Sequence, residues 1–378
     1  MTLAICSRRM FLASMTATLV AGGACPKLGA AAMTETYANV ALPDDIARQW
    51  PDGRTAPQLI LDVARYMADK PWLSLGATRL VGDRMDDHWI GNGADLWRDF
   101  GIFMRLPEGS RVAQWFRDGD TGEPPIVLIG SEGEQRILAP DLHSFLAAWA
   151  LADAADQSTQ KMMADVAAKG TPIELPSDLL RDDDDEDFEG NKIPDGRPEF
   201  ARFLEGKIGQ PLASLLKPSP DSAPFVSFFS AWGERADAEL AANSNLKKIA
   251  EALDQYVPRG KNIWERTSFK LAAAGDRLEI GSANDPRKVL SETEAAAVRP
   301  LILAERKRRA EGVHAVRGLW HSAFVFLYPD GSCQIPADWS SEPKFFHGPL
   351  ATKAEFDAEF ANYPKSPRWI EPWMTAER

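Results

Sequence analysis

The fold is decided by the stretch Ile126–Ala150, which reads IVLIGSEGEQRILAPDLHSFLAAWA. Its first four residues form a short run rich in β-branched side chains between Pro125 and Gly130, as is typical of a buried strand. Gly130 and Gly133 favour a turn, and residues 135–138 predict a partner strand. The start of the stretch therefore predicts a β-hairpin.

A helix is predicted directly after this hairpin. Pro140 and Asp141 suit a helix start, because proline fixes φ and a carboxylate accepts hydrogen bonds from the first free N–H groups. Apolar residues then recur at helical spacing. They are Leu142, Phe145, Leu146, Trp149 and Ala150. We expect one apolar face of this helix to pack back on the hairpin.

The flanking segments predict an α+β domain with a mostly antiparallel sheet and flanking helices. Residues 56–69 have the apolar spacing of an amphipathic helix, and a second helical pattern runs from Phe200 to Leu212. Additional short strands, separated by glycine-bearing turns, are expected at residues 73–80, 100–106 and 111–116. We place this first domain at residues 33–217, ahead of the segment Pro218-Ser219-Pro220.

A second, smaller α+β domain is predicted at residues 222–378. Helical patterns are expected at residues 225–232, 236–256 and 292–311, and strands at 268–273, 277–280, 323–328 and 333–335. The last of these helices ends in Arg306-Lys307-Arg308-Arg309. Cations are favoured there because the helix dipole is negative at its carboxyl end.

An acidic run interrupts the first domain. Residues 156–197 lose regular apolar spacing, and Asp182-Asp183-Asp184-Asp185-Glu186-Asp187 cannot pack without partners, so we expect an exposed insertion. A calcium loop beginning at Asp185 would need a glutamate at its twelfth position, where Gly196 stands. Three interpretations remain: a solvated linker, a patch that binds a basic protein, or a calcium loop that departs from the motif at its twelfth position.

Composition points to the kind of partner. The chain has 378 residues, with 43 Lys and Arg against 55 Asp and Glu, so it repels nucleic acid and anionic membranes and favours a basic protein. Its 12 tryptophans offer large anchors for an interface or a surface for stacking sugars. The candidate partner-binding residues are Asp182, Asp183, Asp184, Asp185, Asp187 and Trp115.

No catalytic constellation emerges from the sequence. The five histidines form no HExxH pattern, and Cys333 is the one cysteine outside the leader, so we predict no metal and no cofactor. The segment Gly130-Ser131-Glu132-Gly133 lacks the spacing of a nucleophile elbow, and a strand rather than a helix is expected after it. We therefore predict no catalytic residue.

The first 32 residues have the pattern of a twin-arginine export signal. Arg8 and Arg9 precede an apolar run of about 15 residues, which is shorter than the roughly 20 needed to span a bilayer. Ala30-Ala31-Ala32 offers a cleavage site after Ala32. The expected location is the periplasm. If translation starts at Met33 instead, the protein is cytoplasmic.

The predicted hairpin, with Gly130 and Gly133 in its turn, and the helix after it also resemble the corresponding segments of a known family. The segment from Gly130 to Leu146 is similar to the SUKH superfamily of Smi1/Knr4-like proteins, and looser similarity runs from Trp72 to about Leu216. Many bacterial members are immunity proteins that neutralise a toxin of the same strain. The family has no catalytic motif, so the resemblance implies a binding role.

The sequence therefore predicts a non-catalytic protein-binding module, an immunity protein that covers the active site of a basic toxin. A different class stays open: an exported hydrolase of cell-wall or plant glycans, with paired carboxylates in a tryptophan-lined cleft. A third alternative is a structural envelope protein without a dedicated ligand.

Overall fold

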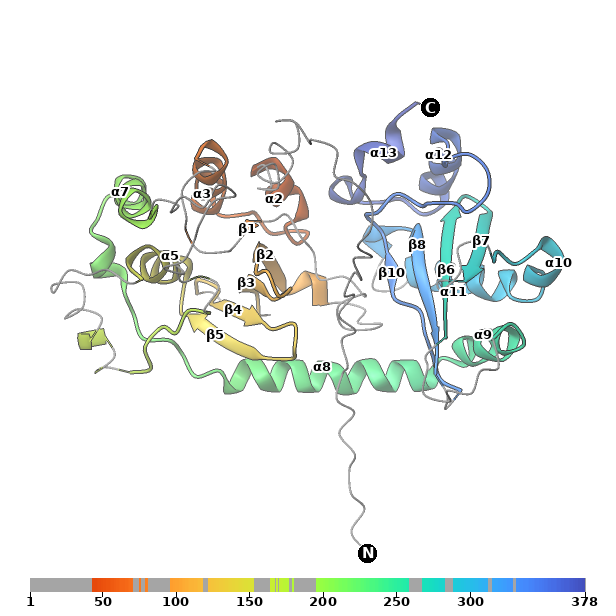
Figure 1. Cartoon of the computed structure of the whole chain (residues 1–378), viewed down its shortest axis with the longest axis horizontal. Helices are drawn as coiled ribbons and strands as arrows, with labels where there is room; N and C mark the ends of the chain where they lie inside the picture. The colour runs from red at the N-terminus through yellow and green to blue at the C-terminus, as the bar shows by residue number, and fades with distance from the viewer. Residues whose placement is uncertain are drawn as a thin grey trace, which may run out of the picture. The chain divides into compact units, whose positions relative to one another are not determined.

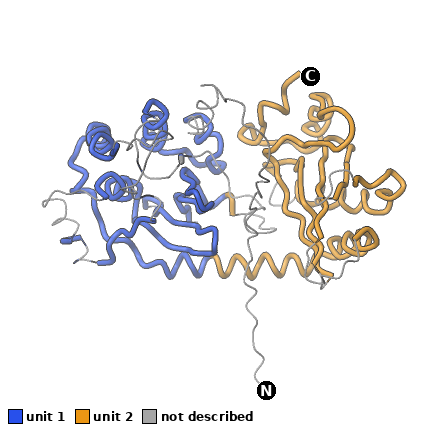
Figure 2. Tube along the Cα trace, viewed as in Figure 1, with its two compact units in different colours: residues 1–84, 98–228 blue, residues 85–97, 229–378 orange. Residues whose placement is uncertain are grey.

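The computed structural model describes residues 43–70, 75, 79–80, 96–117, 122–152, 164–166, 168, 170–176, 179, 195–257, 267–282, 288–311, 315–328 and 331–377. The chain divides into two compact units: residues 1–84 and 98–228 form unit 1, and residues 85–97 and 229–378 form unit 2 (Figure 2). The predicted α+β class is confirmed, because each unit holds helices and an antiparallel sheet (Figure 1).

Unit 1 is built on a five-stranded antiparallel sheet in which each strand pairs with the next along the chain. Its strands are β1 (Arg79–Leu80), β2 (Phe100–Arg105), β3 (Arg111–Trp115), β4 (Ile126–Ile129) and β5 (Gln135–Ala139). The predicted hairpin is confirmed as β4 and β5, with Ile129 opposite Gln135. Every residue of β3 and β4 is buried. Burial of successive residues means that both faces of the sheet are covered, because side chains alternate between the faces.

Aromatic side chains cover the two faces. The ring centres of Trp115 and Phe225 are 4.8 Å apart, and Phe225 lies on α8 (Ala223–Ala242). The ring centres of Phe103 and Phe145 are 5.9 Å apart, and Phe145 lies on α5 (Leu142–Leu151). In Figure 1 the first turns of α8 lie on one side of the unit 1 sheet, while α5 lies on the other side.

Helix α5 corrects one expectation. Asp141 is its N-cap and accepts a hydrogen bond from the Ser144 N–H at 2.7 Å, as the sequence predicts. The helix is buried on nearly all sides rather than on one face, because it packs against β5, α7 (Arg197–Ile208) and the 3-10 helix η3 (Leu212–Leu215). Two further helices of unit 1 are α2 (Pro43–Gln49) and α3 (Gln58–Asp69).

The start of the second part differs from the prediction. We expected separate helices at residues 225–232 and 236–256 after a boundary near residue 222. Instead α8 is one helix of 20 residues, and the unit boundary falls within it, between Phe228 and Phe229. Its first turns pack against the unit 1 sheet through Phe225, so the chain does not divide at the proline segment that precedes the helix.

Unit 2 contains a second antiparallel sheet. Its strands follow the order β10 (Ala337–Asp338), β8 (Ser322–Leu327), β6 (Thr267–Ala274) and β7 (Arg277–Ser282), and β9 (Cys333–Gln334) pairs with β8. The main helices are α9 (Ser244–Asp254), α11 (Arg299–Glu311) and α12 (Lys353–Asn362). Shorter elements are α10 (Glu292–Ala295), α13 (Pro372–Thr375) and the 3-10 helices η1 (Leu96–Arg98), η4 (Ala315–Arg317) and η5 (Pro367–Trp369).

The predicted helix over residues 292–311 is wrong as a single element. It is divided into α10 and α11, with Pro300 in the first turn of α11. A proline there supplies no backbone N–H to the preceding turn and disfavours a helical residue before it, so the chain bends. Among the described residues, none of the helices has both the length and the apolar character needed to cross a bilayer.

Candidate functional site

Most of the predicted partner-binding residues lie outside the described part of the chain. This applies to Asp182, Asp183, Asp184, Asp185 and Asp187, and also to the signal residues Arg8, Arg9 and Ala32. Trp115 is described, and it does not lie at the surface: 2% of it is exposed. Its indole packs against Phe225 and Phe228 of α8, so its position corrects the expectation of a surface anchor.

The other tryptophans are also interior residues. Eight of the nine described tryptophans are buried, and Trp373 is half-buried. In unit 2 some indoles surround an internal cation: the Arg317 guanidinium lies 3.5 Å from the ring centre of Trp339 and 4.5 Å from that of Trp369. Cation–π contacts of this kind hold the interior together. The described tryptophans therefore do not form the stacking cleft expected of a glycan hydrolase.

Unit 1 presents an acidic edge formed by two turns. The β2–β3 and β4–β5 turns lie at the same end of the sheet, because Arg111 at the start of β3 pairs with Ile129 at the end of β4. We call Glu108, Glu132 and Glu134, which are exposed on these turns, the acidic turn edge. Part of its charge is balanced, since Glu134 lies 3.2 Å from the Arg136 guanidinium.

A hydrogen bond joins the two turns to each other. The Ser131 N–H donates to the Ser110 hydroxyl at 3.0 Å, and this bond joins one turn to the next. Gly133 adopts a φ of 91°, a left-handed conformation that glycine reaches without strain. The hydrogen bond between the turns therefore restricts the acidic turn edge before any partner arrives.

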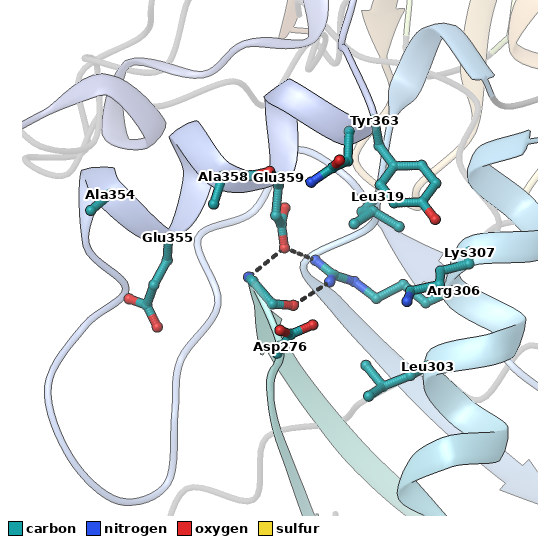
Figure 3. Close-up of a pocket in the computed structure, with 12 residues that line it drawn as sticks. Asp276, Leu303, Arg306, Lys307, Leu319, Ala354, Glu355, Ala358, Glu359 and Tyr363 are labelled. Carbon is teal, nitrogen blue, oxygen red and sulfur yellow. Dashed lines mark hydrogen bonds and ion pairs between the residues drawn. The ribbon is translucent and has the colours of Figure 1, made fainter.

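Unit 2 contains a pocket between α11 and α12, with a volume of about 730 Å³ (Figure 3). We call it the α11–α12 pocket. The β6–β7 turn, Gly275-Asp276, forms part of its lining. Leu303, Arg306 and Lys307 line it from α11, and Ala354, Glu355, Ala358 and Glu359 from α12. Its size falls in the range of small-molecule sites.

A buried ion pair lies in the wall of this pocket. Arg306 donates to the Glu359 carboxylate at 2.5 Å, and its other nitrogens donate to the carbonyls of Trp320 and Gly275. Every nitrogen of this guanidinium is therefore engaged by the protein itself. The sequence pattern predicted Arg306 as a cation near the end of a helix but gave no signal that it would be buried.

The Glu359 carboxylate is only partly satisfied. One oxygen accepts from Arg306 and from the Gly275 N–H at 2.6 Å, whereas Oε2 has no hydrogen-bond partner among the described residues. Burial raises the pKa of Glu359, although the charge of Arg306 acts against this. Glu359 is a functional candidate that sequence reasoning missed, since no motif surrounds it.

His321 lies behind this pair. It is fully buried, and its Nδ1 is 3.7 Å from Glu359 Oε2, which is longer than a hydrogen bond. Burial lowers the pKa of His321 well below its usual 6.5, and the nearby charges of Lys365 and Arg306 act in the same direction. The imidazole is therefore neutral at physiological pH.

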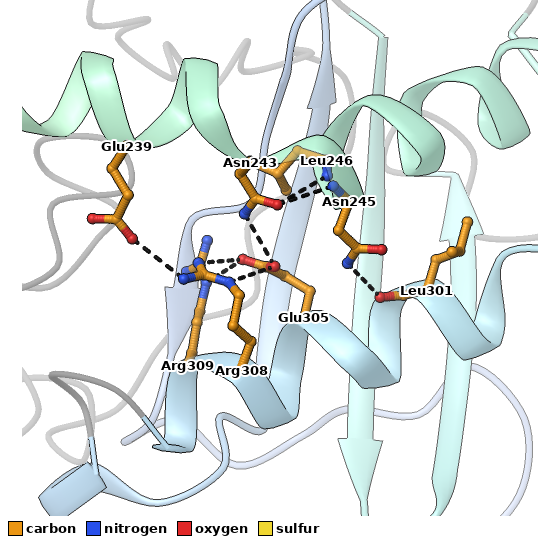
Figure 4. A network of polar contacts seen from close by, with 8 residues as sticks. All are labelled: Glu239, Asn243, Asn245, Leu246, Leu301, Glu305, Arg308 and Arg309. Carbon is orange, nitrogen blue, oxygen red and sulfur yellow. Dashed lines mark hydrogen bonds and ion pairs between the residues drawn. The ribbon is translucent and has the colours of Figure 1, made fainter.

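A second buried network in unit 2 serves stability. Glu305 is fully buried and accepts hydrogen bonds from Arg308, Arg309 and the side-chain amide of Asn243 (Figure 4). Asn243 is also the N-cap of α9, so the network joins α9 to α11. Burial alone would raise the pKa of Glu305, but the hydrogen bond from Arg308 and the charge of Arg309 outweigh it and lower the pKa to about 2.

One group of side chains in unit 1 has the composition of a metal site. Glu123, Asp141 and His143 bring one ligand atom each to within 4.8 Å of one another. Asp141 is already engaged: one oxygen caps α5, and the other accepts from the Lys217 ammonium at 2.6 Å. The lysine supplies the cation that balances this carboxylate, so the geometry is explained without a metal ion.

Comparison with protein-family models, with curated proteins and with solved structures found no match to this chain.

Proposed function

We propose that this protein is a non-catalytic binding protein that engages a basic protein partner. The SUKH resemblance suggests a toxin as that partner, neutralised when its active site is covered. The observation that carries the proposal is the acidic turn edge, where Glu108, Glu132 and Glu134 are exposed on two turns that a hydrogen bond holds together. The excess of acidic residues over the whole chain supports the same partner chemistry.

The proposal combines two physical effects: electrostatic steering of the basic partner, and the rigidity of the two linked turns. Carboxylates at the rim of an interface raise the association rate of a basic partner and exclude acidic proteins. A surface that is already ordered loses little conformational entropy on binding, so more of the interaction energy remains as affinity. Two linked turns meet both requirements better than an isolated acidic loop does.

Co-expression with the toxin-like product of the neighbouring gene tests the proposal. We expect the wild-type protein to restore growth and to retain the toxin in a pull-down. The triple variant Glu108→Gln, Glu132→Gln, Glu134→Gln should protect less well. A matched control removes the same charge from exposed positions of α8 and α9, with Glu234→Gln, Asp237→Asn and Glu251→Gln, and should protect fully. Failure of the wild-type protein both to protect and to bind overturns the proposal.

We further propose export through the twin-arginine pathway, which would direct the protein against a toxin that acts in the periplasm. The support is the order of Arg8, Arg9, the apolar run and the alanine site in the first 32 residues. Cell fractionation of the wild type and of the double variant Arg8→Lys, Arg9→Lys tests this. Wild-type protein found only in the cytoplasm would instead support a start at Met33.

The second candidate is the exported glycan hydrolase. It is favoured by one observation: Glu359, whose pKa is raised by burial, lines a pocket that also contains Asp276 and Glu355. A carboxyl group with a raised pKa is what a general acid requires. The test is an assay of peptidoglycan and plant glycans. Turnover that disappears in Glu359→Gln but persists in Glu355→Gln would support the hydrolase.

A further inference from the structure

We infer that the α11–α12 pocket binds a guanidinium or primary ammonium group carried on an aliphatic chain. The inference concerns unit 2 alone and does not depend on the acidic turn edge. Two sources share this chemistry: a free polyamine, and a lysine or arginine side chain within a peptide.

The polar lining favours a hydrogen-bond donor over an acceptor. The Arg306 guanidinium donates to the carbonyls of Trp320 and Gly275 and pairs with the Glu359 carboxylate, so its charge is already balanced within the protein and attracts an anion only weakly. Among the lining residues, the buried atom that lacks a partner is an acceptor, Glu359 Oε2, and it is closed off from solvent beside the buried His321. The carboxylates that a ligand can reach are those of Asp276 and Glu355, and ionised carboxylates only accept hydrogen bonds.

The charge of the lining favours a cation. Three carboxyl groups line the pocket, those of Asp276, Glu355 and Glu359, against the two bases Arg306 and Lys307. Arg306 is neutralised by its pairing with Glu359, which leaves two carboxylates, Asp276 and Glu355, against one exposed ammonium, Lys307. Asp276, at the exposed β6–β7 turn, and Glu355, on the first turn of α12, are therefore available to attract a cation, although Glu355 also caps its own helix.

The apolar lining suits an aliphatic stem. Ala354 and Ala358 are one helical turn apart on α12 and have no side-chain atoms beyond Cβ, so this wall stays open. Leu303 and Leu319 supply apolar surface (Figure 3). Burial of the methylene groups of lysine, arginine or a polyamine against this apolar surface stabilises the complex, while the charged end remains at the carboxylates. The volume of about 730 Å³ leaves room for the atoms that flank one cationic group.

Isothermal titration calorimetry of the full chain tests the inference with three probes: spermidine, agmatine and the peptide acetyl-Gly-Arg-Gly-amide. The matched neutral probe is the same peptide with citrulline, which has the shape of arginine without its charge. We expect the arginine peptide to bind about tenfold or more tightly than the citrulline peptide, because a charge-assisted hydrogen bond is lost. Equal affinity for the two peptides overturns the inference, and so does the absence of binding by all three cationic probes.

Two substitutions locate the site. Ala358→Leu fills the pocket and should abolish binding, whereas Ala361→Leu, at an exposed position of the same helix outside the pocket, should have no effect. If Ala358→Leu does not fold, Asp276→Asn at the exposed turn gives the second measurement and should weaken binding. Binding that is unchanged in Asp276→Asn and in any folded Ala358→Leu protein places the ligand elsewhere and contradicts the inference.

The probes also separate the two sources. Binding of the arginine peptide without binding of agmatine and spermidine assigns the pocket to a protein side chain. Tighter binding of the free amines assigns it to a small molecule. Protection in the growth assay is measured independently, so failure of this inference leaves the proposed function standing, and the reverse also holds.

Discussion

The Arg306 guanidinium and the Glu359 carboxylate form an ion pair of 2.5 Å in the interior of unit 2, where 1% and 3% of their side-chain surfaces are exposed. Removing two charges from water is costly, and the attraction between them offsets that cost only while both partners are present. The pair holds α11 to α12 and also fixes the β6–β7 turn through the carbonyl and N–H of Gly275.

Arg306→Met should therefore destabilise the protein by about 3 to 5 kcal/mol, because it leaves the Glu359 carboxylate buried without its partner. The double variant Arg306→Met, Glu359→Gln should lose less free energy of unfolding than the two single variants lose in sum. Urea unfolding measures these differences. The exposed pair Lys353 and Asp357 is the control, and Lys353→Ala should leave the free energy of unfolding almost unchanged. Strict additivity of the two buried substitutions would show that the pair is not coupled.

Glu305 makes stability depend on pH. Its pKa in the folded protein is about 2, below the ordinary 4.5, so its contribution is fully present above pH 4.5 and is lost as the pH falls toward 2. The difference between the two pKa values corresponds to about 3 kcal/mol in the free energy of unfolding. Wild-type protein should lose more stability than Glu305→Gln between pH 5 and pH 2, as measured by urea unfolding at each pH. Parallel losses in the two proteins would mean that Glu305 is not held as a carboxylate.

Cys333 should be chemically inert in the folded protein. It is buried, and burial raises the pKa of its thiol to about 12, so almost no reactive thiolate forms at neutral pH. In a variant with Cys6→Ser and Cys25→Ser, iodoacetamide should label the native protein very slowly and the urea-unfolded protein rapidly. Mass spectrometry follows the label. Rapid labelling of native protein would place the thiol at the surface.

Asp141 supports α5 in two ways, as its N-cap and as the partner of Lys217. Asp141→Ala should lower the free energy of unfolding by about 1 to 2 kcal/mol, a typical cost of losing such a cap. Asp141→Asn keeps the cap acceptor and should cost less. Lys217→Met should cost least, because 60% of that lysine side chain is exposed. Thermal or urea unfolding gives this order, and an equal cost for Asp141→Asn and Asp141→Ala would contradict the capping role.

Local signals predicted much of unit 1. The β-branched run at residues 126–129, the glycine turn and the capping Asp141 each act over a few residues, and each was found where the sequence placed it. The burial of α5 on nearly all sides could not be predicted, because it depends on α7 and η3, which follow it by dozens of residues. Tertiary packing decides such features, and periodicity within one helix does not contain that information.

The candidate site in unit 2 could not be predicted from the sequence for a similar reason. Arg306 belongs to the run Arg306-Lys307-Arg308-Arg309, which predicts an exposed basic helix end. In the structure Arg306 and Arg309 are buried, because Glu359 and Glu305 lie where they can pair with them. Charge patterning shows which residues are able to form pairs, but only the fold shows which pairs form. The Asp182 to Asp187 run stays a prediction, since it lies outside the described residues.

The association rate of the purified protein with the neighbouring gene product, measured by stopped flow at low and high salt, tests most directly whether the acidic turn edge binds a basic partner. Neutralising Glu108, Glu132 and Glu134 should slow association about tenfold at low salt and remove most of its salt dependence. The matched variant on α8 and α9, with Glu234, Asp237 and Glu251 neutralised, should associate at nearly the wild-type rate. Equal rates for the two triple variants would contradict a binding role for the acidic turn edge.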